Sequence, residues 1–98
     1  MYSIKPYFVE IFPEHVAGDG WTAIAQFSRQ SDYSKHHITV HKIRFRTQVA
    51  AATRGGAESA AANWARAFVA YAPDMIEASL DTAREVAQID PLTREKRS

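Results

Sequence analysis

Residues 21–28 carry the clearest structural signal in this chain and read Trp21-Thr22-Ala23-Ile24-Ala25-Gln26-Phe27-Ser28. The odd-numbered positions of this run are all apolar, whereas the even-numbered ones are mostly polar. Because side chains alternate between the two faces of a strand, this pattern predicts a strand over about 21–29. The turn sequence Ala17-Gly18-Asp19-Gly20 precedes it, and its glycines permit the positive φ that a tight reversal needs. The run is therefore predicted to be the second arm of a hairpin.

Two further strands are expected on either side of this arm. Residues 6–12 are rich in aromatic and β-branched side chains and stop at Pro13, which indicates the first arm. Residues 38–49 are also extended in character, but their apolar positions change parity near His41 and Lys42. A single uninterrupted strand cannot bury both sets on one side, so we expect a bulge or short turn at that point.

The second half of the chain is predicted to form two helices, over about 54–72 and 75–89. Thr53 is a suitable N-cap for the first, which Pro73 ends. Asp74 and Glu77 have the spacing of a capping box for the second, and residues 92–98 are expected to fray. Apolar residues recur at helical spacing at Ala57, Ala61, Trp64, Phe68 and Ala72, and then at Ile76, Leu80, Ala83 and Ala87.

These elements predict an α+β fold, in which an antiparallel sheet of three to four strands from the N-terminal half packs against two C-terminal helices. The 98 residues are expected to form one domain. The predicted main core consists of Ile43, Phe45, Trp64, Phe68 and Leu80.

Two short motifs resemble those of small bacterial sheet-plus-helix domains of unknown function. One is the glycine turn running into tryptophan, Gly18-Asp19-Gly20-Trp21. The other is Ala52-Thr53-Arg54 leading into an alanine-rich helix with Ala57, Ala60, Ala61 and Trp64. The resemblance covers about residues 5–70 and implies the fold without implying a chemistry. A looser similarity exists to the antitoxin-type modules of bacterial toxin–antitoxin pairs, which usually return to a strand after the helix, where a second helix is expected here.

The composition excludes several classes of protein. With no cysteine, the chain has no disulfide, thiol nucleophile or cysteine zinc site. No apolar run approaches the ~20 residues that cross a bilayer, and the N-terminus lacks the pattern of a signal peptide. We therefore expect a cytoplasmic protein without membrane contact.

No catalytic, cofactor or metal site is predicted. His37 and His41 would stand ~13 Å apart on one strand, too far to share a metal without a bend. The serines lack a nucleophile motif, and the glycines lack the context of a phosphate loop. Glu77, Asp81 and Glu85 share one helix face, as a solvated acidic ridge or as a surface for a basic partner. We therefore expect a non-enzymatic interaction or regulatory module.

Positive charge is concentrated in the middle of the chain. Residues 33–57 hold five basic and no acidic residues, whereas the flanking segments 1–32 and 58–98 each sum to −2. Lys42, Arg44 and Arg46 alternate, so they project from one face of a strand at intervals of ~6.6 Å. Such a stripe is either the solvated face of a sheet or a nucleic-acid contact. The candidate contact residues for nucleic acid or another partner are Lys35, Lys42, Arg44, Arg46 and Arg54.

The first two strands also present apolar side chains on both parities. Phe8, Phe12 and Ile24 cannot share one core with Tyr7, Val9, Ile11 and Trp21. Either the monomer covers both faces of the sheet, or a second copy covers one of them or pairs with an edge strand. The small size of the chain favours a homodimer, with nucleic acid or another protein as further possible partners.

Overall fold

The computed structural model describes residues 1–34 and 40–82 and the backbone of 87–89. In chain order the elements are β1 (Tyr2–Ile4), β2 (Tyr7–Val16), β3 (Gly20–Arg29), the 3-10 helix η1 (Gln30–Ser34), β4 (Lys42–Arg46), α1 (Arg54–Tyr71), α2 (Pro73–Thr82) and β5 (Ala87–Ile89). The strands form one sheet in the order β1-β2-β3-β4-β5. Strands β1 to β4 are antiparallel, and the two helices follow them, which confirms the predicted α+β arrangement.

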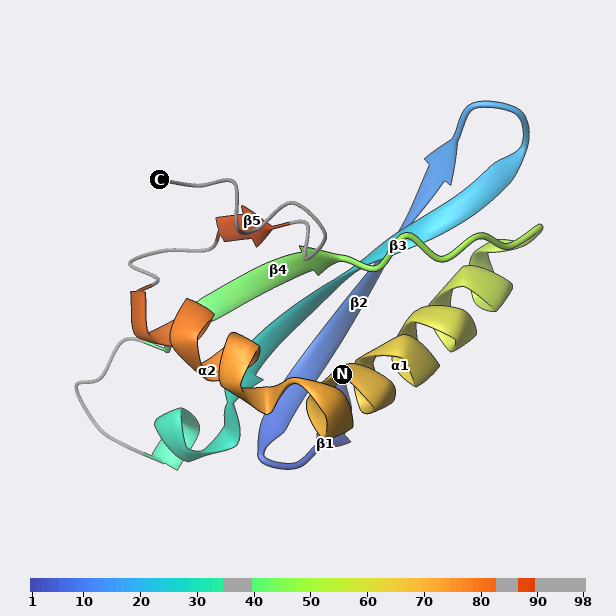
Figure 1. Ribbon diagram of the computed structural model, residues 1–98. Helices are drawn as coiled ribbons and strands as arrows, with labels where there is room; N and C mark the ends of the chain where they lie inside the picture. The colour runs from blue at the N-terminus through green and yellow to red at the C-terminus, as the bar shows by residue number, and fades with distance from the viewer. Residues whose placement is uncertain (35–39, 83–86, 90–98) are drawn as a thin grey trace.

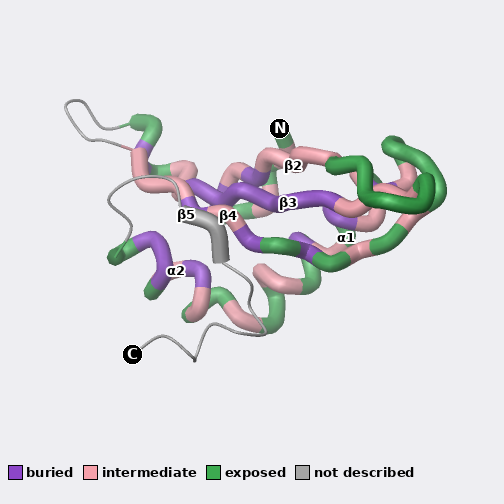
Figure 2. Tube along the Cα trace, turned by 90° about the horizontal axis from the view of Figure 1, so that it is seen from above, coloured by how far each residue is buried: buried purple, intermediate pink, exposed green. Residues whose placement is uncertain are grey.

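The β2–β3 hairpin is the longest feature of the sheet and extends beyond the helices (Figure 1). Its strands pair without interruption from Tyr7 opposite Arg29 to Val16 opposite Gly20. Gly18 and Asp19 reverse the chain with φ of 84° and 69°, the left-handed region that glycine and aspartate tolerate best. Figure 2 shows the hairpin tip exposed and most of β3 buried.

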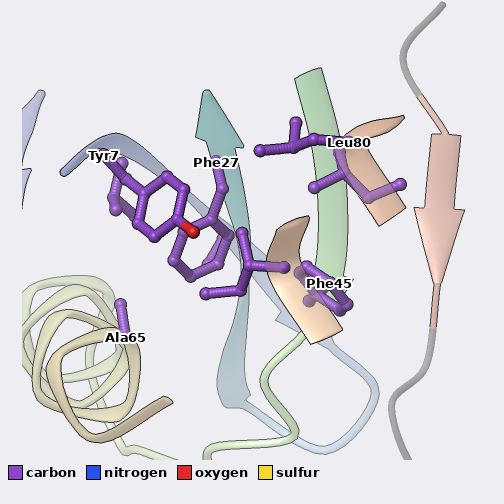
Figure 3. Packing of buried hydrophobic residues seen from close by; sticks show 9 residues of the cluster. Tyr7, Phe27, Phe45, Ala65 and Leu80 are labelled. Atoms are coloured by element: carbon purple, nitrogen blue, oxygen red, sulfur yellow. The ribbon is translucent and has the colours of Figure 1, made fainter. Parts of the chain in front are cut away.

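Both helices pack on the same face of the sheet, and the core lies between the two layers. Phe27 of β3 is at its centre, with its ring centroid 5.6 Å from that of Phe45 and 5.9 Å from that of Phe68. Figure 3 shows Phe27 and Tyr7 from the hairpin, Phe45 from β4, Ala65 from α1 and Leu80 from α2 converging there. Of the predicted core, Ile43, Phe45 and Leu80 are fully buried, while Trp64 and Phe68 are half-buried against it.

The predicted helix over 54–72 matches α1 closely. Thr53 caps it, accepting a hydrogen bond from the backbone N–H of Gly56 at 2.9 Å. Its buried residues are all small, namely Ala57, Ala61, Ala62 and Ala65. A helix with alanine on its inner face can approach a sheet closely, so the larger Trp64 and Phe68 fill the flank of the core.

The third predicted strand, over about 38–49, is present but shorter than expected. Strand β4 begins only at Lys42, and residues 35–39 lie outside the described part of the chain. At the other end, Gln48 has a φ of 61°, which interrupts extended pairing. Residues 40 and 41 are not part of a strand, so the change of parity at His41 and Lys42 falls immediately before β4.

The second helix is shorter than predicted. It is described from Pro73 to Thr82, and residues 87–89 form β5, which pairs with β4 in parallel and makes the sheet mixed. The backbone groups on the outer edge of β4 need hydrogen-bond partners, and β5 supplies them. Residues 87–89 therefore form a strand, although the helical spacing of apolar residues continues to Ala87. The capping box is also absent: Pro73 opens the helix, and the carboxylate of Glu77 instead accepts bonds from Tyr7 and Arg29. The predicted helical residues 83–86 and the predicted frayed tail lie outside the described residues.

Candidate interaction surface

The sheet has a second face that neither helix covers. Because β2, β3 and β4 pair in register, the side chains that alternate with the core residues all emerge on this side. We call it the helix-free face and define it by Phe8, Glu10, Phe12 and Glu14 of β2, Thr22, Ile24, Gln26 and Ser28 of β3, and Lys42, Arg44 and Arg46 of β4.

A polar row crosses the middle of the helix-free face. Glu10, Gln26 and Arg44 are direct neighbours on the three strands. Gln26 donates its Nε2 hydrogen to Glu10 Oε1 at 2.8 Å, and Arg44 donates its Nε hydrogen to Gln26 Oε1, also at 2.8 Å. Gln26 is only 5% exposed, and these two hydrogen bonds satisfy its buried amide. The amide lies between the charged groups of Glu10 and Arg44 and separates them.

Aromatic rings lie on both sides of this polar row. The guanidinium carbon of Arg44 is 4.9 Å from the ring centroid of Phe12, a cation–π contact. At the other end, Phe8 and Tyr33 pack edge to face with centroids 5.1 Å apart, and the Tyr33 hydroxyl lies 3.1 Å from Ser28 Oγ. Tyr33 remains 45% exposed. The helix-free face therefore combines apolar and polar side chains, and those of Ile24, Gln26 and Ser28 on β3 are buried.

Charge on the helix-free face is separated by strand. Its acidic groups, Glu10 and Glu14, are on β2, whereas Lys42, Arg44 and Arg46 are on β4. The intervening strand β3 contributes no charged side chain to this face. A binding partner therefore meets an acidic row and a basic row about 10 Å apart, given two strand spacings.

The structure brings together only some of the predicted contact residues. Lys42, Arg44 and Arg46 share the helix-free face, as their alternation indicated. Arg54 begins α1 and so belongs to the helix layer, and Lys35 lies outside the described residues. Sequence reasoning missed Glu10 and Gln26, because their place beside Arg44 depends on the pairing register of three strands.

Two of the four histidines, and two of the three residues of the predicted acidic ridge, contact other side chains or backbone groups in the described part of the chain. His15 packs against Trp21, and His41 Nδ1 lies 3.1 Å from the carbonyl oxygen of Leu80. Within the part of the chain that the structure describes, no three metal-ligating side chains gather. His36 and His37 lie outside that part, as does Glu85 of the ridge.

The remaining ridge residues, Glu77 and Asp81, bind Arg29 of β3. Arg29 forms ion pairs of 2.9 Å with Glu77 and 2.6 Å with Asp81. Burial alone would lower the pKa of Arg29, but these hydrogen bonds raise it overall. Burial, reinforced by the hydrogen bond that Tyr7 donates to Glu77, raises the pKa of Tyr7. The cluster ties α2 to the end of the hairpin and borders an open hollow of about 560 Å³ that includes Lys5 and Gln30.

No family model, curated protein or solved structure matches this chain. The resemblance to bacterial sheet-plus-helix domains stays a prediction, as do the cytoplasmic location and the absence of enzymatic activity. Among the described residues, neither helix is long and apolar enough to cross a membrane.

Proposed function

We propose that this protein is a small interaction module that binds a folded protein partner on the helix-free face of its sheet. One observation carries the proposal: the face combines half-buried aromatic rings with an acidic row on β2 and a basic row on β4. Such a surface suits a protein whose own face has acidic groups opposite β4 and basic groups opposite β2. The prediction that the module performs no catalysis accompanies this proposal and is untested.

The apolar side chains of the face supply the driving force for such binding. Phe8 and Phe12 are half-buried within the chain, and Tyr33 keeps 45% of its surface exposed. Removing the remaining apolar surface from water is favourable by roughly 25 cal/mol per Å². The charged rows contribute orientation and exclude partners of the wrong pattern more than they add affinity.

Site-specific photo-cross-linking tests the proposal. Phe8 is replaced by the photoreactive amino acid benzoylphenylalanine, and the exposed Ala67 on α1 is replaced in the control. We expect protein adducts from position 8 that decrease severalfold when Arg44→Glu is added, and none from position 67. Equal adducts from both positions, or adducts that a nuclease removes, would contradict the proposal.

Single-stranded nucleic acid is a second candidate, favoured by the same rings beside Lys42, Arg44 and Arg46. Bases stack on aromatic side chains while basic groups bind phosphates. Glu10 and Glu14 oppose this function, because they place negative charge among the rings. We therefore expect no complex at physiological salt in a salt-titrated gel shift with single-stranded and duplex DNA and RNA. A complex that is lost when Lys42, Arg44 and Arg46 are all changed to glutamine would make nucleic acid the ligand.

A further inference from the structure

The helix-free face is complementary to itself. Read across β2, β3 and β4, its central row is acidic, neutral and basic, in the order Glu10, Gln26, Arg44. The same row read in the opposite direction is basic, neutral and acidic. A second face laid on the first with its strand order reversed therefore places opposite charges together along the whole row.

A two-fold axis parallel to β3 produces this reversal. Rotation about such an axis keeps β3 over the partner's β3 and carries β2 over the partner's β4. Because a rotation involves no shift along its axis, residues of one cross-strand row face the same row of the partner. Glu10 then faces Arg44 of the second copy, while Phe12 faces Arg46 and Phe8 faces Lys42 of that copy. An axis perpendicular to the strands would instead place each strand over itself, with like charges together.

The outer edge of β2, which β1 covers only from Tyr7 to Val9, is a poor alternative route to a dimer. Trp21 exchanges backbone bonds with Ala51, and the carbonyl of Ala23 accepts from Thr47, so these residues direct their backbone groups toward β4. The β2 residues opposite Trp21 and Ala23, which include Pro13, consequently direct their backbone N–H and C=O positions to the outer edge of β2. Pro13 has no N–H to donate there, which interrupts the addition of another strand.

The central row keeps hydrogen-bonding capacity for a partner. Arg44 uses its Nε hydrogen on Gln26, and a guanidinium has several further N–H donors. Glu10 accepts from Gln26 through Oε1, and a carboxylate can accept additional bonds. Sheets packed face to face lie about 10 Å apart, a distance that arginine and glutamate side chains span together.

We infer that the partner of the helix-free face is a second copy of this chain, in a symmetric dimer whose axis runs along β3. The inference rests on the proposed function and names its partner. It makes Glu10 and Arg44 the specificity-determining pair, since Glu10 of each subunit faces Arg44 of the other subunit. Phe8 and Phe12, which lie on the opposite side of the sheet from the core, flank this pair on β2 and supply the apolar part of the interface.

Mixing two charge variants tests the inference. Glu10→Lys and Arg44→Glu each place like charges together in a homodimer, so each alone should weaken dimerisation at least tenfold. Mixed together they form two opposite-charge pairs across the axis, and a heterodimer should assemble even though the row within each chain remains broken. Light scattering after size exclusion, from micromolar to near-millimolar concentration, measures the mass against the 11.0 kDa of one chain. Arg54→Glu in the helix layer is the matched control and should dimerise as the wild type does.

A second measurement leaves the charged rows intact. Thr22 lies on β3 and so beside the axis, whereas Ala67 is exposed on α1. The chain has no other cysteine, so Thr22→Cys with a short bismaleimide should form a covalent dimer and Ala67→Cys should not. A wild-type mass of one chain at every concentration overturns the inference, as does a dimer that is indifferent to charge at positions 10 and 44. If the chain is monomeric but position 8 still cross-links to another protein, the proposed function stands and only the second copy is wrong.

Discussion

Tyr7 illustrates how one side chain links the layers of this molecule. It is almost fully buried, donates to Glu77 at 2.5 Å and packs its ring on Phe27. Burial and that hydrogen bond raise its pKa above the ordinary 10.0. Between this value and the folded pKa, the unfolded chain ionises Tyr7 while the folded chain keeps it protonated, so stability falls as the pH rises.

Tyr7→Phe should therefore flatten the alkaline loss of stability. We expect the variant to lose about 1 kcal/mol at neutral pH, where it lacks the bond to Glu77, and to show a shallower decline in Tm above pH 10.0 than the wild type. Tyr71→Phe is the control, because Tyr71 is 91% exposed. An unchanged alkaline slope for Tyr7→Phe would contradict the assigned cause of the shift.

The core prediction concerns Phe45, which is fully buried at the contact of β4 with α1. Phe45→Ala should cost about 3–5 kcal/mol, because it removes buried apolar surface and leaves a cavity. That is a large share of the 5–15 kcal/mol typical of a whole domain. Urea unfolding measures the loss, and Tyr71→Ala should change the midpoint little. Equal effects of the two substitutions would show that Phe45 is not central.

At the scale of elements, we expect replacement by alanine to have different effects at the two glycines of α1. A Cβ at Gly55 meets nothing within 4 Å, so Gly55→Ala should stabilise the helix by about 0.5–1 kcal/mol. A Cβ at Gly56 would lie 3.0 Å from Thr53 Oγ1 and 3.3 Å from Ala51 Cβ, which strains the cap. Gly56→Ala should therefore not give the stabilisation expected for Gly55→Ala. The midpoints of urea unfolding compare the two, and equal gains would contradict the role of the cap.

The end of α2 shows where an element depends on its surroundings. Ile76 and Leu80 are both fully buried, as their helical spacing indicated. The same spacing continues to Ala87, yet the described part of the helix runs only to Thr82, whose hydroxyl lies 3.3 Å from the carbonyl oxygen of Ala78. Beyond it, Ala87 pairs with Ile43 on the edge of β4. Local periodicity could not predict this exchange of helix for strand, because it depends on an edge more than forty residues away in sequence.

At the scale of the whole molecule, Pro13 limits how the sheet can associate. Replacing it by threonine restores an N–H donor on the outer edge of β2, where a further strand could pair. We expect Pro13→Thr to increase aggregation at constant folded stability, measured by light scattering and thioflavin fluorescence. Val16→Thr is the control, since position 16 has the other parity and does not direct its backbone to that edge. Equal aggregation of both variants would indicate that the edge is protected in another way.

The sequence by itself determined the elements whose causes are local. Alternation over residues 21–28, the glycine turn before them and the cap at Thr53 were enough to predict the hairpin and α1, because each depends on neighbouring residues. Alternation also placed Lys42, Arg44 and Arg46 on one side of a strand. These signals act over one turn or one strand, which is the range at which backbone preference and side-chain period operate.

Only the tertiary structure decided what stands beside the basic stripe. Glu10, Gln26 and Arg44 come from three strands, and they form one row because the register of both strand pairs brings them level. The register follows from packing Phe27 and Phe45 under the helices, so it depends on contacts between distant parts of the chain. The same contacts place Phe8 and Phe12 on the helix-free face. They also place acidic side chains beside the basic stripe, so that this face carries both positive and negative charge.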